Sequence, residues 1–384
     1  MDTESANNKT KTKKMKRDWI TKIMDRTPEW LEFRKNGIGA SEIGIICGVN
    51  PYRPTTMELY HQKVGTETRN NILNPAMFHG IYLEKYVADI WQYYDGRELG
   101  YINNYDSGEV QRKARQLHGF VVNPDYPYLF CNLDRMIEKG SYKLRPDGTP
   151  SDEILTERCP LEIKTMSSWV HKKWDRGIPE YYVTQIHQQM LITDTYYGEI
   201  ACLIDGRDLV VFPIERNEAI INMIIEKGAD FWARVIRGRE HYQAAQDVKT
   251  FDLEEYERLM GYVQHYEPEP DDNDGYKEYL SERHKVEQEE VQGSEEMLAM
   301  AKKLQSVKQA IKILDKDKKE MENTIRYNFT KELADKIHFA GEGYMRYYEK
   351  SNSVNKVLDV RVTKPDAFVI ACELEKLNLN IGYE

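Results

Sequence analysis

The sequence predicts an α/β core that precedes a long helix and a small α/β appendage. Apolar residues in Met77–Tyr94 are spaced along one face of a helix. Three short segments, Gly119–Val122, Tyr128–Ile137 and Cys159–Thr165, are rich in the β-branched and aromatic residues that are typical of strands. From Met297 onward, apolar residues recur at alternating steps of three and four, which favours a long helix.

Turn residues and prolines place the other elements of the core. Lys139–Arg158 is polar and rich in Gly, Pro, Asp and Ser, so we expect a long hairpin or a surface insertion there. We expect Pro179–Thr193 to be a helix that its proline opens. The strands Glu199–Ile204 and Asp208–Ile214 are joined by the turn residues 205–207, which predicts a hairpin.

Beyond residue 245 the character of the chain changes. Residues 268–275 read as an exposed loop or linker. The apolar positions of the following helix are Met297, Leu304, Val307, Ile311, Leu314, Met321 and Ile325. Lys318 interrupts this seam, and so few heptads leave open whether the helix forms a coiled coil or docks on a neighbour. His338–Tyr348 and Val357–Val362 are expected strands, and Ala367–Leu377 is an expected helix.

These observations predict five parts of the chain. They are a basic flexible arm at 1–25, an α/β core at 26–245, an acidic linker or helical segment at 246–295, a long amphipathic helix at 296–330, and a small appendage at 331–384.

The net charge of −10 first argues against a nucleic-acid partner, but the acid is concentrated. Residues 251–300 hold 16 acidic against 4 basic residues, a net of −12, so the rest of the chain carries +2. The N-terminal arm holds Lys9, Lys11, Lys13, Lys14, Lys16 and Arg17. This arm suits phosphates or a solvated tail equally well. The charge balance therefore permits DNA without requiring it.

Other classes of protein are poorly supported. No apolar run approaches the roughly 18 residues of a membrane span. The first thirty residues are Lys-rich and have no apolar core of a secretory signal, so we expect a cytoplasmic protein. Five scattered cysteines without a Cys-x-x-Cys pair argue against a zinc ribbon, a disulfide framework and an iron–sulfur cluster.

Four charged residues occur where the pattern predicts burial. Asp134 interrupts an apolar strand, and Glu162 and Lys164 project from the same face of the next one. Glu84 lies in the apolar stripe of its helix. Buried carboxylates usually bind a metal or pair with a cation, and this set suits an oxygen-ligated cation such as Mg²⁺. The alternative is a Glu–Lys ion pair on a solvated strand face, with Glu84 at a helix boundary.

The order of Asp134 and the Glu162-x-Lys164 pair is the signature of the PD-(D/E)xK nuclease superfamily. Its surroundings are more specific: RTPEWLEFRKNGIGASEI, NPY, MFHGIYLE, LEIKT and QIHQQM follow one another. Over roughly residues 26–215 this sequence resembles the YqaJ-type viral recombinase family. The resemblance implies a restriction-endonuclease-like fold, with a mixed central sheet flanked by helices.

The resemblance also implies roles for individual residues. Asp134 and Glu162 look like the metal-binding carboxylates, with the backbone carbonyl of Ile163 as a further ligand. Lys164 looks like the residue that orients the attacking water, and Glu84 like a helical carboxylate that reaches the metal. Gln185 is similar to the family's glutamine near the nucleophile. His187 stands where relatives often have a second glutamine, so its role is uncertain.

The segment Gly37–Ser41 predicts an anion site on physical grounds as well. Two glycines and Ser41 precede an expected helix at Glu42–Cys47, which offers backbone N–H groups to an anion. Arg34 lies close behind with a guanidinium suited to phosphate. By resemblance, Arg34, Gly39 and Ser41 line a pocket for a terminal 5′-phosphate. Asn132 belongs to the same expected pocket as a departure from the family pattern, because it replaces a serine and can still donate to phosphate. The alternative is a helix N-cap beside a surface arginine.

The resemblance implies a Mg²⁺-dependent exonuclease of a phage or prophage, with Mn²⁺ as a substitute metal, acting in the host cytoplasm. It would resect ends of double-stranded DNA in the 5′→3′ direction, as a homotrimer, and pass the 3′ strand to a single-strand annealing protein. One alternative is an endonuclease or flap-type nuclease of the branch that contains Cas4 and the RecB nuclease. Another is a DNA-end-binding scaffold with a decayed nuclease core.

Overall fold

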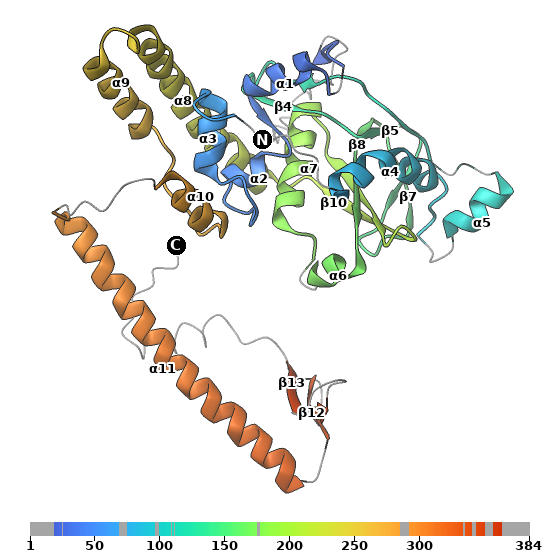
Figure 1. The fold of residues 1–384 in the computed structure, drawn as a ribbon. Coiled ribbons are helices and arrows are strands. Elements are labelled where there is room, and N and C mark those ends of the chain that lie inside the picture. Colours follow the sequence, from blue (N-terminus) through green and yellow to red (C-terminus); the bar gives the residue numbers. More distant parts are fainter. Residues whose placement is uncertain are drawn as a thin grey trace, which may run out of the picture. The chain divides into compact units, whose positions relative to one another are not determined.

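The computed structural model describes residues 19–24, 26–68, 75–96, 100–108, 110, 112–174, 177–284, 292–332, 335–339, 343–349 and 356–362. Its contacts divide the chain into two compact units, Met1–Lys285 and Val286–Glu384 (Figure 1). Within the described ranges, every helix is too short or too polar to span a lipid bilayer. Residues 1–18, which hold all the basic residues named for the arm, and the expected helix Ala367–Leu377 lie outside the described residues.

A five-stranded mixed sheet forms the centre of the first unit. Its strands, in sheet order, are β10 (Asp208–Glu215), β9 (Tyr197–Ile204), β8 (Cys159–Met166), β5 (Arg135–Ile137) and β2 (Ala114–Arg115). β8 and β9 run parallel, and all the other neighbours are antiparallel. The continuous pairing of β9 with β10 confirms the predicted hairpin.

Helices cover both faces of this sheet because successive side chains of a strand point to opposite sides. The two covering helices are α4 (Pro75–Trp91) and α7 (Glu180–Thr193), as predicted. On β9, Ala201 and Leu203 pack in one apolar cluster with α4. Ile200 and Cys202 pack in a different cluster with α7. The predicted α/β fold with a mixed sheet flanked by helices is therefore confirmed.

A smaller sheet adjoins the other side of α7. It has the order β1 (Ile38–Gly39), β4 (Leu129–Cys131) and β3 (Val121–Val122), with β1 parallel to β4. The buried Gln188 side chain of α7 donates from Nε2 to the carbonyls of Ile38 and Phe130, at 2.9 Å each. One amide thus ties α7 to two neighbouring strands.

The prediction of a single strand at Tyr128–Ile137 is wrong. The chain leaves the smaller sheet at Cys131 and enters the central sheet at Arg135. Asp134 stands in the break, where its carboxylate accepts the backbone N–H of Ile163 at 2.8 Å. The polar stretch Lys139–Arg158 contains the predicted hairpin, formed by β6 (Tyr142–Leu144) and β7 (Pro150–Ile154).

The remaining helices of the first unit surround these sheets. They are α1 (Pro28–Lys35), α2 (Ile43–Ile46), α3 (Thr56–Val64), α5 (Gly100–Ser107), α6 (Ser168–His171), a 3₁₀ turn η2 (Lys172–Trp174), α8 (Glu218–Val248), α9 (Leu253–His265) and α10 (Gly275–Arg283). α8 approaches α3 closely at Gly238, where a Cβ atom would lie only 2.1 Å from the Tyr60 hydroxyl. This close approach requires glycine.

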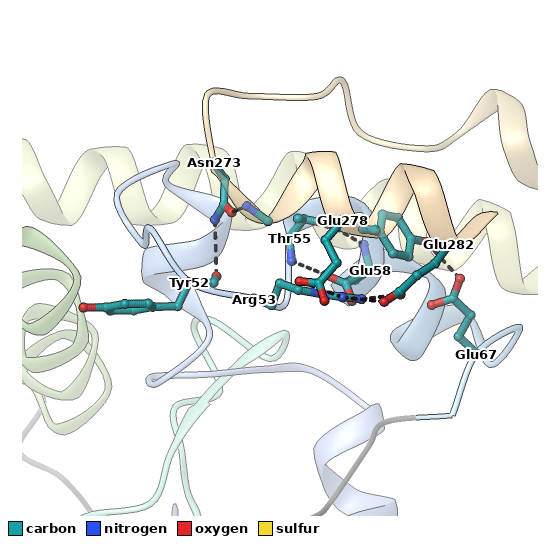
Figure 2. Close-up of polar contacts among 10 residues, drawn as sticks. Tyr52, Arg53, Thr55, Glu58, Glu67, Asn273, Glu278 and Glu282 are labelled. Carbon is teal, nitrogen blue, oxygen red and sulfur yellow. Dashed lines mark hydrogen bonds and ion pairs between the residues drawn. The ribbon is translucent and has the colours of Figure 1, made fainter. Parts of the chain in front are cut away.

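Part of the acidic segment folds against the core. Figure 2 shows Arg53 among carboxylates from α3 and α10. Its Nη1 and Nη2 donate to Glu282 at 3.0 and 2.9 Å, and its Nε donates to Glu58 at 3.0 Å. Glu278 pairs with the same guanidinium at 3.3 Å. Acid that is concentrated in the sequence is therefore partly neutralised by this arginine.

The second unit contains the predicted long helix, α11 (Glu295–Glu332). Of its predicted apolar seam, Met297, Leu304, Ile311 and Met321 are exposed. Phe329, which is outside that seam, is buried. A three-stranded antiparallel sheet follows, formed by β11 (Lys336–Phe339), β12 (Gly343–Glu349) and β13 (Lys356–Val362). The expected strand His338–Tyr348 is two strands, because β11 and β12 pair as a hairpin.

Candidate active site

The centre of the site comes from the alternation of side chains along β8. Leu161 and Ile163 pack in the apolar cluster on the α4 face. Glu162 and Lys164 lie opposite Ile200 and Cys202 in register, so they point to the α7 face. The strand thereby places one carboxylate and one ammonium group side by side beneath α7.

Glu162 is buried, and three side chains donate to its carboxylate. Its Oε1 accepts from Lys164 Nζ at 2.5 Å and from Gln185 Nε2 at 2.6 Å. Its Oε2 accepts from Gln189 Nε2 at 2.5 Å. Gln189 was missed by the sequence reasoning, although it stands one helical turn after Gln185 and therefore on the same face of α7.

Asp134 lies close enough to Glu162 and Lys164 for electrostatic interaction. Burial raises the pKa of Asp134 well above its ordinary value, and the Glu162 carboxylate raises it further. Glu84 adds to this rise, while Lys164 and the N–H of Ile163 oppose it. Asp134, Glu162, Lys164 and Gln185, four of the predicted residues, are thus brought together.

Lys164 remains a cation in this setting. Burial acts to lower its pKa, but the Glu162 and Asp134 carboxylates outweigh burial and raise the pKa above its ordinary value. Its Nζ also lies 4.9 Å from the centre of the Tyr182 ring. A protonated lysine held in this way can donate hydrogen bonds to a phosphate oxygen or to a water molecule.

Glu84 reaches the site from the other face of the sheet, on α4. Its carboxylate accepts from Arg135 Nη1 at 2.6 Å, and the same nitrogen donates to the Asp134 carbonyl at 2.5 Å. Arg135 is buried and links Glu84 to the chain beside Asp134. The sequence reasoning missed Arg135. The role of Glu84 as a metal ligand stays a prediction.

The predicted phosphate pocket is built around a buried carboxylate, Glu42. Arg34 Nη2 donates to its Oε1 at 2.8 Å, and the backbone N–H of Gly39 donates to its Oε2 at 2.9 Å. Lys63, which the sequence reasoning missed, donates to the same Oε2 at 2.7 Å. An incoming phosphate would meet two cations here and would compete with Glu42 for them.

The other predicted members of this pocket are less clearly assembled. The expected helix Glu42–Cys47 is a single turn, because α2 spans only Ile43–Ile46, so its dipole contributes little. Ser41 is exposed just before it. Asn132 is half-buried in the break between β4 and β5, two residues before Asp134. Their phosphate contacts stay predictions.

His187 has a structural setting. Its Nδ1 donates to the Val183 carbonyl at 2.7 Å, and its Nε2 accepts the backbone N–H of Asn217 at 3.1 Å. Burial lowers its pKa, which favours the neutral ring that these two bonds require. Asn217 is the N-cap of α8, so His187 joins α7 to the start of that helix.

The chemistry of the donor set fits a hard divalent cation. Asp134 and Glu162 are two close carboxylates at least partly removed from water, and burial together with the Glu162 charge raises the Asp134 pKa, so a bound cation would stabilise the ionised pair. Glu162 is engaged by three donors instead, and Glu84 by Arg135. Among the described residues, no three His, Cys, Asp or Glu side chains converge as a ready metal centre.

Replacing Asp134 with asparagine is expected to stabilise the metal-free protein at pH 8. The folded-state pKa of Asp134 is raised, so its contribution to stability is full below pH 3.8 and is lost as the pH rises through the raised pKa. If the substitution removes about 1 kcal/mol of this electrostatic destabilisation, the Tm should rise by roughly 2–4 °C. Thermal unfolding in EDTA checks this.

The wild type and Asp134→Asn should respond differently to Mg²⁺. Mg²⁺ at a hundredfold excess over Kd is expected to increase the free energy of unfolding of the wild type by about 2.7 kcal/mol and so to raise its Tm. The Tm of Asp134→Asn should not rise. A lower Tm for the variant than for the wild type in EDTA at pH 8 would contradict the electrostatic argument.

This chain is similar to a known domain family and to curated proteins. The family model of the YqaJ-like viral recombinase domain matches residues 29–196. Protein YqaJ of Bacillus subtilis (strain 168) is 29% identical over 213 residues, which are 55% of this chain and 56% of that protein. This chain therefore spans little more than half the length of that relative. A protein of African swine fever virus (strain Badajoz 1971 Vero-adapted) is 20% identical over 247 residues, 61% of this chain and 67% of that protein.

Solved structures are more distant. An alkaline exonuclease, LHK-Exo, from Laribacter hongkongensis is 18% identical, with a TM-score of 0.38 over 58% of this chain and 99% of that one. The Shutoff and Exonuclease Protein of Kaposi's sarcoma-associated herpesvirus is 11% identical, with a TM-score of 0.32 over 56% of this chain and 70% of that one. The family match confirms the resemblance seen in the motifs: over residues 29–196 the sequence is similar to the YqaJ-like viral recombinase domain.

Proposed function

We propose that the protein is a metal-dependent deoxyribonuclease that degrades linear duplex DNA from its 5′ ends. One observation carries this proposal: Glu162, Lys164 and Asp134 meet beneath Gln185 and Gln189, within a viral recombinase domain. A carboxylate pair that holds a cation, beside a protonated lysine, is suited to phosphodiester hydrolysis because both the cation and the lysine stabilise negative charge on the phosphate.

Asp134 and Glu162 would hold Mg²⁺, or Mn²⁺ in its place. When bound, the ion supplies Lewis-acid polarisation of the phosphate and lowers the pKa of water. Lys164 donates a hydrogen bond to the attacking water or to a non-bridging phosphate oxygen. The water oxygen attacks phosphorus and gives one proton to solvent, the bond from phosphorus to the 3′ oxygen breaks, and that 3′ oxygen takes a proton from solvent. The products are a 5′-mononucleotide and a strand that again ends in a 5′-phosphate.

Gln185 and Gln189 position the carboxylate in this scheme. Each amide donates to a different oxygen of Glu162, so the plane of the carboxylate is fixed. Arg34, Lys63 and the N–H of Gly39 supply the donors for a terminal phosphate, with Glu42 as their partner when no phosphate is bound. Recognition of that phosphate would favour digestion from 5′ ends.

The family also supports a wider proposal. A viral recombinase domain suggests that the nuclease serves recombination, exposing a 3′ strand for a single-strand annealing protein. We propose a homotrimer on the same ground, in the cytoplasm of a host cell. The second unit, with its partly exposed α11 seam, is available for either assembly.

The test is digestion of three DNA substrates in Mg²⁺: linear duplexes with 5′-phosphate ends, linear duplexes with 5′-hydroxyl ends, and closed circles. We expect mononucleotides from the phosphorylated linear duplex, less from the hydroxyl ends, and none from circles. Lys164→Ala, purified in parallel, should be inactive and so excludes a contaminating nuclease.

Two results would overturn the proposal in different ways. Cleavage of circles would show an endonuclease of the same superfamily. Binding of DNA ends without cleavage in Mg²⁺ or Mn²⁺ would show a scaffold that has lost its chemistry.

A further inference from the structure

Just after β8, the strand that carries Glu162 and Lys164, the chain exposes a tryptophan to solvent. Among the six tryptophans, all of which lie in described residues, only Trp169 of α6 is exposed, with 67% of its surface accessible. Lys173 Nζ lies 3.7 Å from the centre of its ring. This indole gains little free energy from burial in the protein, and it offers an aromatic surface to a ligand.

The charge around this pair favours a polyanion. Residues 163–174 include Lys164, His171, Lys172 and Lys173 and no acidic residue. Lys172 and Lys173 are both exposed. The carboxylate of Asp205 accepts the backbone N–H of Ser168 at 2.8 Å, so it is engaged at the start of α6. The outward surface therefore combines an aromatic ring with positive charge.

Packing of Trp174 and a helix cap hold the segment 167–174 in place, and the same packing connects it to Lys164. Trp174 is buried, and its ring lies 5.7 Å from the rings of both Tyr182 and Phe212. Tyr182 in turn carries Lys164 Nζ over its ring at 4.9 Å. The Ser167 side chain caps α6 by accepting the N–H of Val170. A rigid ring loses little conformational entropy when a ligand stacks on it.

The distance from the chemistry suits the same DNA molecule. Trp169 follows Lys164 by five residues, so their Cα atoms are at most about 18 Å apart. Successive nucleotides of one strand of duplex DNA rise about 3.4 Å, so the Cα atoms of the two residues are separated by no more than roughly five nucleotide steps. Stacking on an aromatic side chain requires a base whose face is not covered by a neighbour.

We propose that Trp169 and Lys173 form a subsite for an unpaired base of the DNA, with Lys173 on the adjoining phosphate. This inference rests on the proposed function, because it takes DNA as the substrate. It adds a contact outside the catalytic cluster and outside the terminal-phosphate pocket. It assigns the ring to single-stranded DNA rather than to a protein partner.

The test measures binding in EDTA, which prevents cleavage. The full-length protein is titrated with a short oligothymidylate and with an abasic oligonucleotide of the same length, while tryptophan fluorescence is followed. We expect oligothymidylate to quench the fluorescence and to bind about tenfold more tightly than the abasic strand. Trp169→Ala should lose both the quenching and this preference, and Trp169→Phe should keep most of the preference.

Tyr196 provides a matched control. It is also an exposed aromatic residue with a cation near its ring, Arg216 at 5.4 Å. It precedes β9, at the end of the sheet opposite the Met166–Ile204 pair that leads to α6. Tyr196→Ala is expected to bind both oligonucleotides as the wild type does.

The failures of the two proposals can be told apart. If the wild type digests linear duplex but Trp169→Ala retains full preference for oligothymidylate, the subsite is wrong and the nuclease stands. If the wild type neither binds nor digests DNA, the proposed function is wrong and the subsite falls with it.

Discussion

Glu162→Gln is expected to lower the rate of DNA digestion by roughly 10²–10³-fold, because it removes several kcal/mol of transition-state stabilisation. The glutamine would lose the negative charge that pairs with Lys164 at 2.5 Å. Its own NH₂ group would also face the NH₂ group of Gln185 or Gln189, both of which now donate to Glu162. Single-turnover digestion of a 5′-phosphorylated duplex in saturating Mg²⁺ gives the rate.

A matched control comes from the same helix. His187 lies between Gln185 and Gln189 in sequence but contacts Val183 and Asn217 instead of the carboxylates. His187→Gln should therefore digest DNA at close to the wild-type rate, with a lower Tm. A Glu162→Gln protein that retains the wild-type rate, or a His187→Gln protein that loses it, would show that the reacting centre lies elsewhere.

Arg112→Ala is expected to lower the free energy of unfolding of the first unit by about 3–5 kcal/mol, because it leaves a buried carboxylate without its cation. Arg112 and Glu199 both have side chains with no solvent exposure, and they form two hydrogen bonds with each other. Tyr197 and Trp91 donate to the same carboxylate, at 2.5 and 3.1 Å. Denaturant unfolding followed by circular dichroism measures the loss.

Two further variants separate the charge from the packing. Arg112→Met combined with Glu199→Leu removes both charges and should cost less than either single change to an apolar residue. Arg115→Ala removes an ion pair with Glu138 whose arginine is 46% exposed, and should change stability by less than about 1 kcal/mol. If Arg112→Ala is as mild as Arg115→Ala, the buried pair does not stabilise the fold.

Local patterns in the sequence predict the parts of the site that lie within one element. The alternation of Leu161 to Thr165 places Glu162 and Lys164 on one face, and the structure has them there. The i, i+4 spacing of Gln185 and Gln189 carried the same kind of information. The β9–β10 hairpin follows from its turn residues in the same way.

Contacts between distant elements could not be predicted in this way. Arg135 meets Glu84 across 51 residues, and Arg112 meets Glu199 across 87. Nothing in the local pattern around Arg112 distinguishes it from a surface arginine. The break between β4 and β5 was missed for a related reason: both halves of the run are buried and rich in apolar residues, although they lie in different sheets.

The β6–β7 hairpin has a consequence for how such proteins diverge. The hairpin lies within the 27 residues between Asp134 and Glu162. The chain leaves the central sheet after Ile137 and re-enters it at Cys159, and these two residues are paired in register. Lengthening a loop whose ends are already fixed adds little entropic cost. The interval between the two carboxylates is therefore free to drift among descendants, while the pairing of β5 with β8 preserves their distance. A sequence search that requires a fixed number of residues between the two carboxylates would overlook true relatives. A structural comparison of the β5–β8 register would find them.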